Sequence, residues 1–105
     1  MIAFAKMHGN GNDFVVFENL DRAFGTEDLS RLAIALCDRK KGLGGDGILV
    51  AEPSTKAPLA MRIFNRDGSE GKMCGNGIRC FAKYVYERGI VRRDEMSVET
   101  LAGIM

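Results

Sequence analysis

A change from a polar turn to an apolar helix constrains the fold of this chain more than any other stretch. Residues 65–71 read NRDGSEG and are rich in turn formers, so no helix or strand is expected to run through them. The pattern that follows ends with Arg88 and then Gly89, a basic last turn and a glycine stop. The sequence predicts a helix from Asn76 to Arg88, starting just after Cys74. Its apolar residues recur at the spacing of one helix face and are Ile78, Phe81, Ala82 and Val85.

The position of Cys74 at a predicted helix start has chemical consequences. Unpaired N–H groups and the positive end of the helix dipole favour a thiolate over a thiol there. Gly75 and Gly77 permit close approach of an anionic group such as a carboxylate. The alternative is a buried structural cysteine. The flanking glycines and the polar turn favour the exposed, reactive interpretation.

Two motifs of this sequence resemble those of the diaminopimelate epimerase family. The first is KMHGNGNDF at residues 6–14, and the second joins FNRDGSE at residues 64–70 to CGNGIRC at residues 74–80. Both are long and occur in the family's order, so the resemblance is specific and covers the whole chain. The chain is similar to the N-terminal half of these enzymes, which are amino-acid epimerases that use two cysteines and no pyridoxal phosphate.

The resemblance implies an α+β fold in which a curved mixed or antiparallel sheet wraps around a central helix. Residues 1–105 would form a single domain, one of two similar domains in the whole enzyme, with the C-terminal domain absent. The implied reaction converts LL-diaminopimelate to meso-diaminopimelate by inverting its α-carbon, without a cofactor. This step leads toward lysine and cell-wall peptidoglycan.

The resemblance also implies which residues form the site. It makes Cys74 catalytic and gives Asn12 and Asn65 a role in substrate binding. From the residues alone, the loop around Asn12 reads equally well as a tight connection, and Asn65 reads equally well as the start of a turn. The backbone N–H groups of Gly75 and Asn76 are suited to hold a substrate carboxylate. No cysteine spacing matches a zinc-ligand pair, so no metal site is expected.

Inversion of a carbon centre needs a base on one face and an acid on the other, so Cys74 requires a second group. Cys80 lies about 9 Å farther along the predicted helix, at ~1.5 Å per residue, and cannot bracket the same carbon. Cys37 lies on the apolar face of a predicted helix and is expected in the core. The second cysteine is therefore expected outside this chain, and the family resemblance implies that a second, C-terminal domain supplies it. The isolated chain is predicted to have little or no activity.

The other expected elements follow from local patterns. An amphipathic helix is predicted from Thr26 to Cys37, with an N-cap and an acidic first turn at its start. The loop at residues 8–13 holds His8, which we interpret as a structural residue. The cluster RKK at residues 39–41 is expected to complement a helix end. Strands are expected at residues 2–6, 14–18, 48–52, 59–65 and 96–100, the fourth with alternating burial.

Composition narrows the class of protein. The chain has 105 residues, 46% of them hydrophobic and 28% charged, with a net charge of +1, which is typical of one soluble globular domain. No basic run indicates nucleic acid, and no segment reads as a signal peptide or a membrane span. The three cysteines are expected to be reduced thiols in the cytoplasm.

The sequence also leaves alternatives. Gly47 stands where many family members have glutamine, and Asn10 replaces a residue that is often apolar. These departures leave the fine substrate specificity undetermined, but not the type of reaction. A related racemase for another amino acid is a second interpretation, although proline-racemase relatives tend to have histidine where this chain has Asn76. A non-catalytic binding domain is a third. Apolar surface left uncovered by a missing domain would favour a homodimer.

Overall fold

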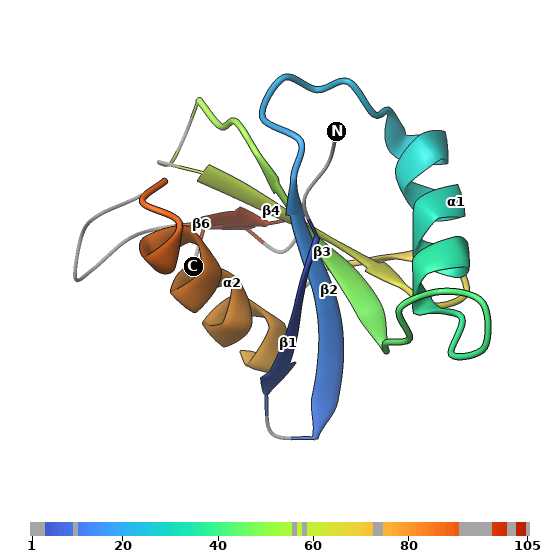
Figure 1. The fold of residues 1–105 in the computed structure, drawn as a ribbon. Coiled ribbons are helices and arrows are strands. Elements are labelled where there is room, and N and C mark those ends of the chain that lie inside the picture. Colours follow the sequence, from blue (N-terminus) through green and yellow to red (C-terminus); the bar gives the residue numbers. More distant parts are fainter. Residues whose placement is uncertain are drawn as a thin grey trace.

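The chain folds into a mixed β-sheet with a helix on each face (Figure 1). The computed structural model describes residues 4–9, 11–55, 57, 59–72, 75–90, 98–100 and 103–104. The strand order is β1-β2-β3-β4-β6-β7, and β5 pairs with β4. The strands are β1 (Ala5–Gly9), β2 (Asn12–Glu18), β3 (Gly47–Glu52), β4 (Leu59–Asn65), β5 (Glu70–Gly71), β6 (Val98–Thr100) and β7 (Gly103–Ile104), and the helices are α1 (Thr26–Cys37) and α2 (Gly75–Glu87).

The sheet contains both parallel and antiparallel strand pairs. Strands β2 and β3 are parallel and α1 lies between them in sequence, whereas β4 and β6 are parallel with α2 between them. The pairs β1–β2, β3–β4 and β6–β7 are antiparallel. The predicted α+β class with a mixed sheet is therefore confirmed. Helix α2 packs against β1, β2, β3 and β4, and α1 lies on the opposite face (Figure 1).

The sheet separates two apolar clusters, because successive side chains of a strand point to opposite faces. Phe14 and Val16 of β2 pack on the side of α2, whereas Val15 and Phe17 pack on the side of α1. Strand β3 divides in the same way, and all six of its residues are buried. Coverage on both faces explains why these two strands read as continuous apolar runs.

Strand β4 differs in one respect from the alternating burial predicted for it. Leu59, Met61 and Ile63 are buried toward α2, as expected. Phe64 on the other face is also buried, with 1% of its surface exposed, and it packs in the cluster beneath α1. The prediction of a half-buried strand was wrong at this end, because α1 contacts β4 there.

Helix α1 has the predicted bounds, but its N-cap residue is Gly25 and not Thr26. The Gly25 N–H donates to Asp28 Oδ2 at 3.2 Å, so the first-turn carboxylate closes the helix start. The Thr26 hydroxyl instead accepts a hydrogen bond from Arg62 Nη2 at 3.0 Å.

Helix α2 begins and ends one residue earlier than predicted. The predicted glycine stop is confirmed, because Gly89 has a φ of 73° and the following Ile90 N–H donates to Val85 O at 3.0 Å. The polar side chains Arg79, Lys83 and Glu87 form a stripe along α2 and are exposed, as is the neighbouring Tyr86 at 53%. Among the described residues, the sheet packs against the other side of this helix.

The connections are tighter than predicted. The expected loop at residues 8–13 lies largely within β1 and β2, and Gly11 has a φ of 91° in the short turn between them. After the turn that follows β4, the chain forms β5, which pairs with β4. This strand was not predicted, because its sequence is rich in turn formers. Of the predicted strand at residues 96–100, the structure describes Val98–Thr100 as β6. Within the described ranges, no helix is long and apolar enough to cross a membrane.

Candidate functional site

Three of the strands bring candidate site residues to one edge of the sheet. In the strand register, Gly47 of β3 lies opposite Phe14 of β2 on one side and opposite Asn65 of β4 on the other. Asn12, the first residue of β2, and Asp46, the residue before β3, therefore lie at the same edge as the end of β4. Local sequence patterns cannot reveal this arrangement, because it depends on how the strands pair.

Helix α2 begins at this edge with Gly75, the residue that follows Cys74 in the sequence. Cys74 itself lies outside the described residues. Gly75 is exposed, and a Cβ built on it would meet no atom within 4 Å. The first N–H groups of a helix have no partner within the helix. The start of α2 therefore combines open space with hydrogen-bond donors.

Asn76 and Asn12 are in direct contact. Asn76 Nδ2 donates to Asn12 Oδ1 at 2.8 Å, although the two residues are 64 positions apart in the sequence. Both side chains are partly buried. The structure therefore brings together two of the residues that the sequence suggested for substrate binding.

Asn65 lies at the same edge but does not join this pair. Its Nδ2 donates to Ser69 Oγ at 3.1 Å, and its backbone N–H donates to Ser69 O at 2.7 Å. The residue is exposed. Both contacts close the turn between β4 and β5, so the turn-initiating role considered for Asn65 is present in the structure.

Sequence reasoning overlooked Asp46 as a member of this site. Its Oδ2 accepts hydrogen bonds from the backbone N–H of Asp13 at 2.9 Å and from Asn12 Nδ2 at 3.5 Å. Its Oδ1 lies 3.4 Å from Arg39 Nη2. An aspartate inside a glycine-rich loop, next to a buried strand, was the available signal.

Arg39 and His8 both bind Asp13 at the border of the site. Arg39 Nη1 lies 3.3 Å from Asp13 Oδ2, and His8 Nδ1 lies 2.6 Å from Asp13 Oδ1. These two partners, with His8 contributing most, hold the pKa of Asp13 below its usual value. Arg39 thus lies just beyond the end of α1 and pairs with carboxylates of the site.

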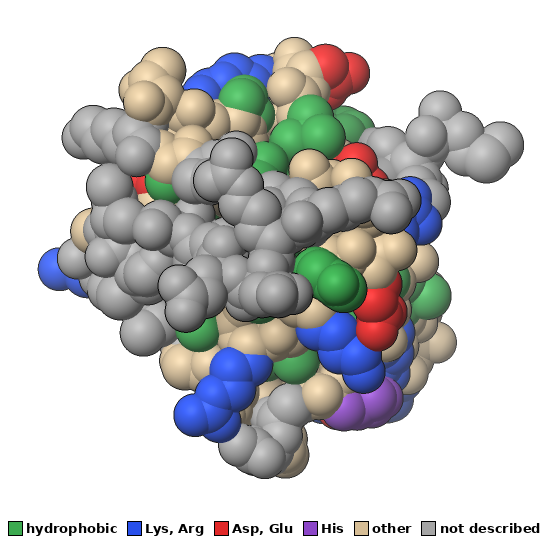
Figure 2. Space-filling model, turned by 90° about the vertical axis from the view of Figure 1, so that its left-hand side faces the viewer, with side chains coloured by type: hydrophobic (Ala, Val, Ile, Leu, Met, Phe, Trp, Pro, Cys, Tyr) green, Lys and Arg blue, Asp and Glu red, His purple; other side chains and the backbone are tan. Residues whose placement is uncertain are grey.

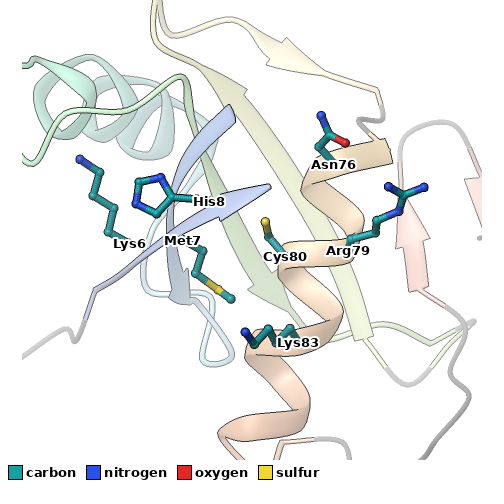
Figure 3. A pocket seen from close by; sticks show the side chains of 7 residues that line it. All are labelled: Lys6, Met7, His8, Asn76, Arg79, Cys80 and Lys83. Atoms are coloured by element: carbon teal, nitrogen blue, oxygen red, sulfur yellow. The ribbon is translucent and has the colours of Figure 1, made fainter. Parts of the chain in front are cut away.

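A cavity of about 490 Å³ lies between β1 and α2, beside Asn76 (Figure 3). Met7 points from β1 toward α2, and Cys80 points from α2 toward β1. Figure 2 views this side of the molecule and shows Lys and Arg side chains gathered near His8, drawn in purple. The cavity therefore has an apolar floor and a basic rim. Its lining residues are Lys6, Met7, His8, Asn76, Arg79, Cys80 and Lys83.

The two described cysteines occupy the two apolar clusters. Cys37 packs beneath α1 and is 3% exposed, and its burial raises the pKa of its thiol. The prediction that Cys37 belongs to the core is confirmed. Cys80 is 5% exposed and packs between α2 and the sheet.

Gly47, the residue after Asp46, is buried in β3. A Cβ built at this position would lie 2.8 Å from the carbonyl oxygen of Phe64 on the neighbouring strand. A larger residue therefore requires the backbone of β3 or β4 to shift.

Across the described part of the chain, no three His, Cys, Asp or Glu residues are grouped so that they could hold a metal ion.

The chain matches known proteins along almost its entire length. The sequence profile of the diaminopimelate epimerase family matches residues 4–105. A diaminopimelate epimerase from Caldanaerobacter subterraneus subsp. tengcongensis is 61% identical over 102 residues, which are 97% of this chain and 36% of that protein. A diaminopimelate epimerase from Archaeoglobus fulgidus is 52% identical over 105 residues, which are 99% of this chain and 37% of that protein. The chain thus spans little more than a third of the length of these relatives.

Solved structures support the same fold. A hydroxyproline epimerase from Agrobacterium vitis superposes with a TM-score of 0.74 at 17% identity, over 98% of this chain and 35% of that chain. At this identity the likeness shows the fold alone. The family itself is shown by the sequence match, which confirms the resemblance carried by the two motifs. The chain belongs to the diaminopimelate epimerase family.

Proposed function

We propose that the chain is the N-terminal part of a cofactor-independent epimerase that converts LL-diaminopimelate to meso-diaminopimelate. The family match and the names of its relatives support this proposal. The observation that carries it is the junction at the start of α2. Helix α2 begins at the residue after Cys74, and its second residue, Asn76, is hydrogen-bonded to Asn12 of β2.

The chemical difficulty of this reaction is to remove a proton from the α-carbon of an amino acid. Without pyridoxal phosphate, the charge of the resulting carbanion spreads only onto the adjacent carboxylate, which the protein must stabilise with donors. The N–H groups of Gly75 and Asn76 at the start of α2 would supply these donors. Asn12 and Asn65, which lie at the same sheet edge, would orient the rest of the substrate.

Cys74 would exchange the proton on one face of the substrate, as a thiolate base in one direction and a thiol acid in the other. A second cysteine, in a C-terminal domain of the complete enzyme, would serve the opposite face. The chain spans about 36% of its relatives, which leaves room for such a domain. On this proposal the 105-residue chain holds one half of the site and does not turn over substrate alone.

The test compares the chain with the complete enzyme in heavy water. The complete enzyme should invert LL-diaminopimelate and incorporate deuterium at the α-carbon, and its Cys74→Ala variant should do neither. The 105-residue chain should show no inversion above background. Inversion at the wild-type rate by the isolated chain would disprove the assignment of the second base to another domain.

A further inference from the structure

We infer that Asp46 is a positioning residue that sets the direction of a chain of hydrogen bonds from Asn76 through Asn12. The inference deepens the proposed function, on which its consequence for the substrate rests. These hydrogen bonds connect three parts of the fold. Asp46 precedes β3, Asn12 begins β2, and Asn76 lies in the first turn of α2. The NH₂ group of Asn76 donates to Asn12, and the NH₂ group of Asn12 donates to Asp46.

In the structure, the donors and acceptors of this series follow one order. Asn76 Nδ2 donates to Asn12 Oδ1 at 2.8 Å, and Asn12 Nδ2 donates to Asp46 Oδ2 at 3.5 Å. The second contact is long, and it is the contact through which Asp46 orients Asn12. The same Oδ2 atom accepts the Asp13 N–H at 2.9 Å, which fixes its position beside Asn12.

The chemistry of the groups makes this direction the favourable one. An ionised carboxylate only accepts hydrogen bonds, so it selects the NH₂ end of the Asn12 side chain. The carbonyl end of Asn12 is then turned toward Asn76, where it selects the NH₂ end of that amide. A reversed Asn12 would place its oxygen against the oxygen of Asp46. One acceptor thus orients two amides in succession.

Asp46 is itself held in place on both sides. Its backbone N–H donates to Asp13 O at 2.8 Å, and its carbonyl accepts the Arg66 N–H at 3.2 Å. Its other carboxylate oxygen faces Arg39. The acceptor is therefore fixed between β2 and the end of β4 before any ligand binds, which is the condition for positioning by preorganisation.

The consequence for the proposed reaction concerns the polarity of the surface that meets the substrate. An amide offers an acceptor at one end and donors at the other, so a flipped Asn76 would present the opposite group to a bound amino acid. By fixing Asn12 and Asn76, Asp46 would keep the same groups facing the substrate in every molecule. Loss of this order should weaken substrate binding more than it slows the chemical step.

The direct test needs no substitution. In the wild-type 105-residue chain, NMR should detect scalar coupling across the hydrogen bond from Asn76 Nδ2 to the side-chain carbonyl carbon of Asn12. Coupling in the reverse direction, from Asn12 Nδ2 to Asn76, would overturn the inference. Neither outcome depends on catalytic activity.

Three variants then separate the acceptor from the negative charge. Asp46→Ala should shift the side-chain amide resonances of both Asn12 and Asn76. Asp46→Asn should shift them less than Asp46→Ala does, because an amide oxygen held by Asp13 N–H still accepts from Asn12, although the amide nitrogen then faces Arg39. Asp38→Ala is the matched control, because the Asp38 carboxylate likewise accepts from the backbone, from Lys40 N–H and Lys41 N–H, but does not touch Asn12. Unchanged resonances in Asp46→Ala, or equal shifts in Asp46→Asn, would contradict the inference.

Kinetics of the complete enzyme test the link to the proposed function. Asp46→Ala should raise KM by about tenfold with a smaller change in kcat, and Asp46→Asn should stay near wild type. Altered amide resonances with an unchanged KM would contradict the substrate role of Asn12 and Asn76. That result would still support the positioning of the amides by Asp46.

Discussion

Asn76 of α2 donates its side-chain amide to Asn12 of β2 at 2.8 Å and so ties the start of a helix to the start of a strand. The two residues belong to the two motifs that identify the family. Their contact places the first turn of α2 beside the sheet edge where Asn65 also lies. The proposed site thus forms where two separate sequence segments meet, and neither segment holds all of its residues.

The pairing of Asn12 with Asn76 should be measurable as a coupling free energy. Asn12→Ala and Asn76→Ala should each destabilise the chain, and the double variant should lose less than the sum, with a coupling of about 0.5–1.5 kcal/mol. Urea unfolding of the four proteins measures it. Asn12→Ala with Asn65→Ala is the control pair, because these side chains do not contact each other, and it should be additive within about 0.5 kcal/mol. Additivity in the first pair would refute the coupling.

The three cysteines should differ in reactivity. Cys37 and Cys80 are 3% and 5% exposed, so iodoacetamide should modify both slowly. If Cys74 is poised as proposed, it should react well before them, and Cys74→Ser should remove the fast phase. Mass spectrometry of tryptic peptides assigns each site over time. Equal slow rates for all three would instead favour a structural or binding role for Cys74.

Substitution of Gly47 should destabilise the sheet. A Cβ at this position would lie 2.8 Å from the carbonyl oxygen of Phe64, so Gly47→Ala should cost about 1–3 kcal/mol of unfolding free energy. Gly47→Gln, which adds a larger side chain at the same place, should cost at least as much. Gly75→Ala is the control, since its Cβ meets nothing within 4 Å, and it should be neutral or slightly stabilising. A fully stable Gly47→Gln variant would show that β3 and β4 can separate at this point.

Tyr84 should make stability depend on pH in the alkaline range. Burial, with the nearby Glu18 carboxylate, raises the pKa of Tyr84 from 10.0 to about 12. The folded state holds this proton more tightly than the unfolded state. The contribution of Tyr84 to the free energy of unfolding is therefore full below pH 10 and is lost as the pH rises toward 12. Tyr84→Phe should therefore flatten the fall in unfolding free energy between pH 10 and 12.

Tyr84→Phe should also cost about 0.5–1.5 kcal/mol at pH 7, because it removes the hydrogen bond of 3.1 Å to Glu18 Oε2. Tyr86→Phe is the matched control, since Tyr86 lies on the same helix and is 53% exposed. It should change neither the stability at pH 7 nor the alkaline slope. An unaltered slope in Tyr84→Phe would show that another group governs the alkaline transition.

The sequence by itself determined the elements whose signals are local. The bounds of α1, the glycine stop of α2 at Gly89, and the strands β3 and β4 all follow from periodicity and turn chemistry within a few residues. The two motifs likewise pointed to the family, because a motif is a local pattern. The roles of Cys74, Asn12, Asn65, Gly75 and Asn76 in catalysis remain predictions.

Only the tertiary structure decided how these elements meet. The parallel pairing of β2 with β3, the burial of Phe64 on the second face of β4, and the contacts of Asp46 with Asn12 and Arg39 depend on strand register and on where α1 packs. The physical reason is that burial and hydrogen bonding are satisfied between segments far apart in the chain, and no window of sequence records which segments become neighbours.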